Sequence, residues 1–443
     1  MNLADTLNLG CACQTLSLPR LREQLETGPA LDGLAARLSV SHPHLFSASA
    51  VFLDSGVAQQ IREAVAAIER VIALPAWRDQ ALARAPSIAA RDHGPVGAFM
   101  GYDFHLSDAG PRLIEINSNA GGAVLNAALA RAHSACCNAF GQVLDPHDAL
   151  RSLDTVFVDM FRSEWALQRG DAPLRTVLIV DDAPRQQYLA PEFDMVRELF
   201  AAHGLTALVA DAAELQWRDG QLHHPALPVG TEVDLVYNRL TDFYLHDDTH
   251  QALRLAHEAG AVVLTPHPRT HALYADKRNL IALSDTDLLA RWGVSESDRA
   301  LLRAVVPTTQ RVGIDNADAL WAGRRGLFFK PAAGFGARAA YRGDKLTRRV
   351  WGEIMAGDYV AQALVPPSER LVRVQDDTHL LKLDLRAYTY RGEVQLMAAR
   401  TWTGQTTNFR TEGGGFSPVV VLPTVPAPLS QVGHEAAQQF NTH

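Results

Sequence analysis

The amino-acid sequence predicts a multidomain protein of mixed α/β and α+β class. Three observations support this class. Apolar residues recur at spacings of three and four within residues 1–92, strand-like and helix-like runs alternate over residues 172–268, and strand-like runs dominate after Trp321. A chain of 443 residues is also long enough for two or three domains.

The first region, residues 1–92, is expected to be helical. Its clearest repeat, VAQQIREAVAAIERVI, supports a helix over residues 48–72. Residues 93–150 follow as a β-hairpin and then a helix, GGAVLNAALARAH, which the pair Gly121 and Gly122 opens.

Residues 172–268 are expected to form a Rossmann-like domain with a parallel sheet. The strand-like runs RTVLIVDD, LTALVAD, VDLVYNR and AVVLTP alternate with the helix-like runs PEFDMVRELFAAHG and DDTHQALRLAHEAG. The first turn carries Asp181 and Asp182 where a dinucleotide-binding domain has its G-x-G-x-x-G loop, so NAD binding is not expected.

The last large region, residues 270–425, is expected to be rich in strands. A helix is predicted from Asp276 to Leu289, before the strand-like segments GLFFKPA, RAAYRG, YVAQALV, LKLDLRAYTYRG and EVQLMAARTW. Residues 426–443 read as a tail with a short terminal helix.

Composition restricts the function classes. The chain is 47% hydrophobic and 20% charged, which is typical of a globular protein, and its net charge of -8 favours neither nucleic acid nor an anionic membrane. Four cysteines are too few for a disulfide framework, and the start of the chain lacks the features of a secretion signal. We therefore expect a cytoplasmic protein with small-molecule partners; a homodimer is a possible assembly.

An acidic cluster in the predicted hairpin indicates a magnesium site. Glu115 and Asn117 are two residues apart in the run LIEIN, so in a strand their side chains project from one face. Asp103, on the preceding strand, could supply a third oxygen, and oxygen ligands are what Mg²⁺ prefers. The alternative is a hairpin edge with solvated acids.

Two lysines and a strand indicate a nucleotide site. Lys330 ends an apolar strand and precedes Gly334 and Gly336, whose flexible backbone could lie over phosphates. Lys277 stands at a predicted helix start, where a bound anion would favour a cation. The strand beside Gln362 to Leu364 could bind an adenine edge, although periodicity alone indicates only a strand.

Taken together, these segments resemble the ATP-grasp superfamily of carboxylate–amine ligases, over residues 95–422. The acidic cluster precedes both lysines, which looks like a circular permutation and is similar to glutathionylspermidine synthetase and its bacterial relatives. The run from Ala399 to Val419 resembles their ending with Arg400, Asn408 and Gly413 to Gly415.

The resemblance implies ATP and Mg²⁺ as cofactors and an amide or peptide bond made through an acylphosphate. It departs at Gly101, where those relatives often have an arginine, so Arg386, Arg400 or Arg410 would take that role. Substitution of Asp103 by Asn or Glu115 by Gln is expected to stop turnover and leave the fold intact. The alternatives are a phosphotransferase, a non-catalytic nucleotide-binding protein and, less supported, a nicotinamide oxidoreductase.

Overall fold

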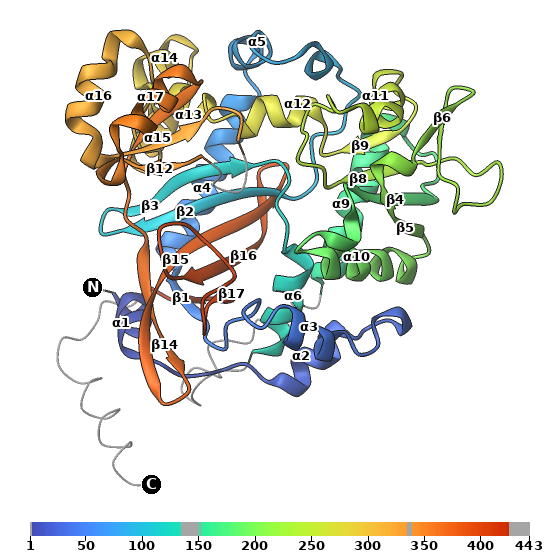
Figure 1. Ribbon diagram of the computed structural model, residues 1–443, viewed down its shortest axis with the longest axis horizontal. Coiled ribbons are helices and arrows are strands. Elements are labelled where there is room, and N and C mark those ends of the chain that lie inside the picture. Colours follow the sequence, from blue (N-terminus) through green and yellow to red (C-terminus); the bar gives the residue numbers. More distant parts are fainter. Residues whose placement is uncertain (1, 134–149, 151, 335–338, 425–443) are drawn as a thin grey trace.

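A computed structural model describes residues 2–133, 150, 152–334 and 339–424 (Figure 1). Gly336 and the expected tail at 426–443 lie outside the described residues. Within the described part of the chain, no helix is long and apolar enough to span a membrane.

The largest sheet has seven strands and takes them from both ends of the chain. Its order is β1, β17, β16, β15, β2 and β3, with β14 also paired to β15. β1 and β17 are parallel, and the other pairs are antiparallel. The bounds are β1 (Val51–Asp54), β2 (Met100–Ser107), β3 (Gly110–Asn117), β14 (Ser368–Val374), β15 (Asp377–Tyr390), β16 (Glu393–Trp402) and β17 (Gly415–Leu422).

Helix α4 (Ser55–Ile72) packs on one face of this sheet through apolar side chains. The predicted helix over 48–72 is therefore correct only from Ser55, and the region 1–92 is not wholly helical. Residues 51–54 pair with β17 instead, and Asp54 then caps the helix by accepting a hydrogen bond from the Gly56 N–H. The remaining helices of this region are α1 (Leu3–Gly10), α2 (Leu18–Leu25), α3 (Leu34–Ser41) and α5 (Pro75–Leu82).

A second, antiparallel sheet lies in the yellow and orange part of the chain (Figure 1). Its order is β10 (Thr309–Arg311), β13 (Tyr359–Ala363), β11 (Leu327–Pro331) and β12 (Tyr341–Arg342). The helix expected from Asp276 to Leu289 is interrupted, because Asp285 ends one helix and caps the next by accepting from the Leu288 N–H. The helices here are α13 (Asn279–Ser284), α14 (Thr286–Arg291), α15 (Glu296–Val305), α16 (Ala317–Gly323) and α17 (Arg348–Ala356).

The alternating strands and helices expected after residue 172 are present. Four parallel strands lie in the order β5 (Thr206–Asp211), β4 (Thr176–Asp181), β8 (Leu235–Asn238) and β9 (Val263–Thr265). Their side chains are mostly apolar because helices cover the sheet. These helices are α9 (Leu153–Arg169), α10 (Ala190–Ala202) and α11 (Gln251–Glu258). A short hairpin, β6 (Gln216–Arg218) and β7 (Gln221–His223), was not predicted.

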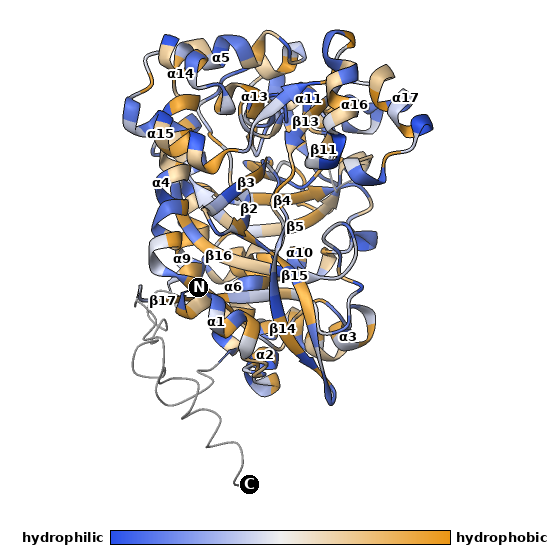
Figure 2. Ribbon diagram, turned by 90° about the vertical axis from the view of Figure 1, so that its left-hand side faces the viewer, coloured by the Kyte–Doolittle hydropathy of each residue, from blue (hydrophilic) through white to orange (hydrophobic). Residues whose placement is uncertain are grey.

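The helix expected after Gly122 is α6 (Ala123–Ala132), whose first N–H groups donate to the buried Glu192 carboxylate. It packs against the face of the large sheet opposite to α4. Figure 2 shows hydrophobic residues along the central strands and hydrophilic residues on the outer helices.

Candidate functional site

The hairpin of β2 and β3 brings the three predicted metal ligands together. Asp103 lies directly opposite Glu115, while Phe104 lies opposite Leu113, so Ile114 is one extra residue in β3. Such a bulge shifts the alternation of side chains by one position. Because directly paired strand residues share a face, Glu115 lies on the face of Asp103, and so does Asn117 two residues along. On the other face, Phe104 packs in the core with α4.

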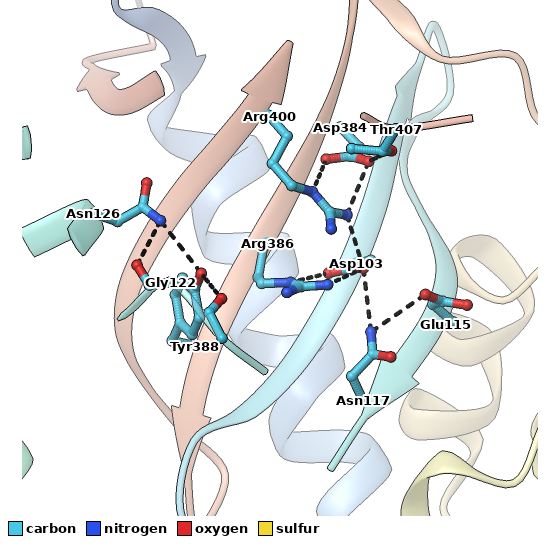
Figure 3. A network of polar contacts seen from close by, with 11 residues as sticks. Asp103, Glu115, Asn117, Gly122, Asn126, Asp384, Arg386, Tyr388, Arg400 and Thr407 are labelled. Carbon is cyan, nitrogen blue, oxygen red and sulfur yellow. Dashed lines mark hydrogen bonds and ion pairs between the residues drawn. The ribbon is translucent and has the colours of Figure 1, made fainter. Parts of the chain in front are cut away.

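Asp103 is held by two arginines from neighbouring strands (Figure 3). Arg386 donates to both carboxylate oxygens at 2.6 Å, and Arg400 donates to Oδ2 at 2.9 Å. Arg400 also binds Asp384 at 2.8 and 2.9 Å, and Thr407 donates to the same carboxylate. Burial opposes ionisation of Asp103, but the two guanidinium groups hold its pKa well below the ordinary range.

The neighbouring Glu115 is ionised for a different reason. Burial alone would raise its pKa, but the positive charges of Lys277 and Lys330 bring that pKa below the ordinary value. The Asn117 amide donates to Asp103 at 3.2 Å and to Glu115 at 3.4 Å. Glu115 therefore keeps more acceptor capacity than Asp103, whose oxygens already accept four hydrogen bonds.

Lys330 connects the two sheets. Its ammonium group donates to the Ile114 carbonyl at 2.7 Å, on the bulge of the large sheet, and to Gln362 Oε1 at 2.9 Å, within its own sheet. Burial lowers the pKa of Lys330 to about 8. Lys277 donates to the Gly334 carbonyl at 2.6 Å, so the second lysine lies beside the start of the glycine loop that follows β11.

A cavity of about 330 Å³ lies between the two sheets and contains most of the predicted residues. Its charged lining has more cations than anions: Lys277, Lys330, Arg342, Lys382, Arg386 and Arg400 against Asp103, Glu115 and Asp384. Its apolar lining includes Phe328, Leu364, Val365, Pro366 and Trp402. The cavity thus presents both cationic and apolar side chains, although the chain as a whole is negatively charged.

The predicted adenine segment lines this cavity, but part of its backbone is already bonded. The Ala363 N–H donates to Thr308 and the Leu364 N–H donates to Gly326. Gln362 is 2% exposed, and its buried amide nitrogen has no hydrogen-bond partner among the described residues. An unpartnered buried donor at a cavity wall is a group that a ligand could satisfy.

Some predicted residues lie elsewhere. Asn408 is not part of the cavity lining; its amide bonds Thr403 and Thr406 and holds its own loop. The glycine run is structural at Gly415, where an added Cβ would lie 2.5 Å from the His44 carbonyl.

Position 101, where the resemblance implied an arginine, has no room for a side chain. A Cβ added to Gly101 would lie 2.6 Å from the Ala120 Cβ and 3.4 Å from Arg386 Nε. The absence of a side chain at Gly101 therefore leaves space for Arg386 to reach Asp103. Arg410 is exposed and does not line the cavity.

Sequence reasoning missed Asp384, Thr407 and Trp402. Asp384 had a usable signal, because it precedes Arg386 by two residues in a strand and must share its face. Trp402 had the same signal, because it follows Arg400 by two residues in a strand. Thr407 had none, since its approach depends on the path of the loop after β16.

Comparison with known proteins supports the fold. Neither a protein-family model nor a curated protein matches the chain. A solved glutathione synthetase-like effector from Globodera pallida is similar over 91% of this chain and 97% of its own, with 11% identity and a TM-score of 0.53. The chain therefore shares the fold of that effector.

Weaker matches include a γ-glutamylcysteine synthetase-like protein from Methylobacillus flagellatus, with 11% identity, 79% and 83% coverage and a TM-score of 0.44. The ATP-grasp ligase PsnB has 13% identity, 60% and 94% coverage and a TM-score of 0.27.

Proposed function

We propose that this protein is an ATP-dependent carboxylate–amine ligase that forms an amide or peptide bond through an acylphosphate. The observation that carries the proposal is the cavity between the two sheets, where Lys330 and Lys277 stand opposite Glu115 and Asp103. An excess of cations in the lining suits a polyanion such as a triphosphate, and the apolar side chains of the lining suit its base.

In this proposal, Lys277, Lys330 and the backbone near Gly334 bind the phosphates. The adenine lies against Leu364. The N–H groups of Ala363 and Leu364 already donate hydrogen bonds. The adenine edge would therefore bind carbonyl groups of the strand or the N–H group that follows Leu364. The unpartnered amide nitrogen of Gln362 is a further donor to the nucleotide.

The oxygens of Glu115 and Asn117 fit a magnesium ion, with Asp103 as a ligand that would have to release an arginine hydrogen bond. The ion would neutralise phosphate charge. Arg400 and Arg386 line the same wall and would hold the acylphosphate that forms from the substrate carboxylate.

The chemistry has two steps. A carboxylate oxygen attacks the γ-phosphorus and ADP leaves; an amine nitrogen then attacks the acyl carbon, phosphate leaves and the nitrogen loses a proton. Buried cations that are already in place stabilise the charge that develops in both steps. We assign no residue of this chain as the base.

The proposal also includes the arrangement of two domains. The ATP-grasp region is circularly permuted, which agrees with a large sheet that joins residues 100–117 to residues 368–422. The parallel sheet of residues 176–265 is a Rossmann-like pre-ATP-grasp domain on the substrate side.

A second candidate function is nucleotide binding without catalysis. The specific observation in its favour is Asp103, whose oxygens are occupied by Arg386, Arg400 and Asn117 rather than free for a metal. This candidate predicts ATP affinity with no release of ADP.

One experiment separates these functions. The protein is incubated with ATP, Mg²⁺ and pools of amino acids and polyamines, and ADP and phosphate are measured against a Lys330→Met control. The ligase proposal expects equal amounts of ADP and phosphate that depend on a pool and on Lys330. ATP binding without turnover in any pool would support the second candidate, and absence of ATP binding would reject both.

A further inference from the structure

A second, smaller cavity of about 180 Å³ lies next to the nucleotide cavity. The two cavities share three lining residues, Asn117, Lys277 and Gly334. We call the smaller one the inner cavity. Because the shared residues include Lys277, the junction lies where the proposed function places phosphates.

The wall of the inner cavity is aromatic and polar but almost uncharged. Phe243 stacks on His271 with ring centroids 3.9 Å apart and planes 8° from parallel. Ser118 shares a hydrogen bond of 3.2 Å with His271 Nδ1. Burial lowers the pKa of His271 to about 3, so the ring is neutral near pH 7.

Lys277 is the charged residue of this wall, and no Asp or Glu belongs to the described lining. The carboxylate of Asp276, next in sequence to Lys277, is taken up by Arg278 and Arg84. Lys277 donates one hydrogen bond to Gly334, and an ammonium group has three donors. The remaining donors can serve an anion at the junction.

On the basis of the proposed function, we infer that the inner cavity binds the carboxylate substrate, with its carboxylate at Lys277 and an apolar or flat group against Phe243. Its substrate class is a small carboxylic acid, such as an amino acid or a short peptide. A polyamine does not fit here, because its cationic nitrogens would meet Lys277 and no acidic side chain. The carboxylate would then lie at the junction, within reach of the phosphate that it attacks.

The test traps the activated acid. Hydroxylamine replaces the unknown amine and converts an acylphosphate to a hydroxamate, so the twenty amino acids and a set of dipeptides can be screened with ATP and Mg²⁺. Spermidine is screened separately by phosphate release. The inference expects a hydroxamate from at least one of the acids.

Two variants then locate the acid. Thr241→Glu places a carboxylate in the inner cavity and should raise the KM for the acid at least tenfold, while Thr241→Gln, of the same size and neutral, should stay within about threefold of wild type. Phe243→Ala should raise the same KM with ATP affinity unchanged. Binding of ATP to each variant, measured by calorimetry, shows that the variant is folded.

The failures are distinguishable. Hydroxamate formation with an unchanged KM in Thr241→Glu and Phe243→Ala would overturn the inner cavity as the acid site and leave the ligase proposal standing. Phosphate release that requires spermidine, with no hydroxamate from any acid, would mean ATP hydrolysis without acid activation and would overturn the inference. No turnover with any acid or amine would reject the ligase proposal, and the inference with it.

Discussion

At the scale of single residues, the site is a balance of buried charges. Asp103 is stabilised as an anion by Arg386 and Arg400, while Glu115 depends on Lys277 and Lys330. Nothing in the sequence was a reason to treat the two acids differently, but in the structure they have different charged partners. Removing the charge of Asp103 leaves two buried guanidinium groups short of a partner.

From the sequence alone we expected Asp103→Asn to leave the fold intact; its two arginine partners now predict a loss of stability. Breaking a buried ion pair from one side costs about 3–5 kcal/mol, so this variant should lose that much of its free energy of unfolding. Glu115→Gln should lose less and still lose turnover at limiting Mg²⁺. Urea denaturation of both variants checks the difference, and equal stability would show that the arginine pairs of Asp103 contribute little.

Lys330 is predicted to bind phosphate directly. A charge-assisted hydrogen bond contributes about 1.5–3 kcal/mol, so Lys330→Met should weaken ATP affinity by roughly tenfold to a hundredfold. Lys345 is exposed and nearby, and Lys345→Met serves as the control. Titration of both variants with ATP decides the matter; near-wild-type affinity in both would remove the main support for the nucleotide site.

The same lysine predicts a pH dependence. Burial places its pKa at about 8, below the ordinary value, so the group is charged below pH 8 and loses its proton above it. ATP affinity should therefore be constant from pH 6.5 to 7.5 and fall above pH 8, by up to about tenfold per pH unit.

The same pKa shift of Lys330 changes protein stability with pH in the direction opposite to its effect on ATP affinity. Between pH 8 and about 10.4 the unfolded chain binds more protons at this lysine than the folded one, so its contribution to stability rises with pH. ATP affinity measured from pH 6.5 to 9.5 tests the binding part, with Lys330→Met as the control; a flat wild-type profile would show that the buried lysine does not contact phosphate.

At the scale of elements, the sequence predicted strands and helices well where they follow a simple pattern. The parallel strands, the hairpin and the long strands β15 and β16 were recognisable. β1 was not, because its three apolar residues before a helix read as part of that helix, and its partner β17 lies far along the chain. The bulge at Ile114 was equally hidden, since an extra residue is visible only against its partner strand.

The loop before β17 yields an element-scale prediction. Gly415 has φ of 109°, and a Cβ there would meet the His44 and Leu45 carbonyls at 2.5 and 2.6 Å. Gly404 has φ of 93° with nothing within 4 Å of an added Cβ. Gly415→Ala should therefore destabilise the protein by about 1–3 kcal/mol more than Gly404→Ala. Equal losses in thermal or urea unfolding would mean that backbone strain alone matters.

At the scale of the whole molecule, an acidic chain contains a cationic cavity. The net charge is -8, yet the cavity between the sheets has twice as many cations as carboxylates in its lining. This local field attracts anions that the outer surface repels.

Salt should therefore weaken ATP binding more than adenosine binding. Raising KCl from about 0.05 to 0.5 M shortens the range of electrostatic attraction severalfold, and the affinity for ATP should fall severalfold. Adenosine carries no phosphate, so its affinity should change little. Parallel titrations of the two ligands compare these effects; an equal salt dependence would argue against a phosphate-binding cavity.

The large sheet combines strands from early and late parts of the chain, and this affects folding during synthesis. β2 and β3 emerge from the ribosome about 260 residues before β15, their partner strand, begins. At a translation rate of about 5–20 residues per second, the edge of β2 stays unpaired for roughly 13 to 50 s. An unpaired apolar strand edge is a template for association with other chains. The yield of soluble protein should therefore fall when translation is slowed between β3 and β15.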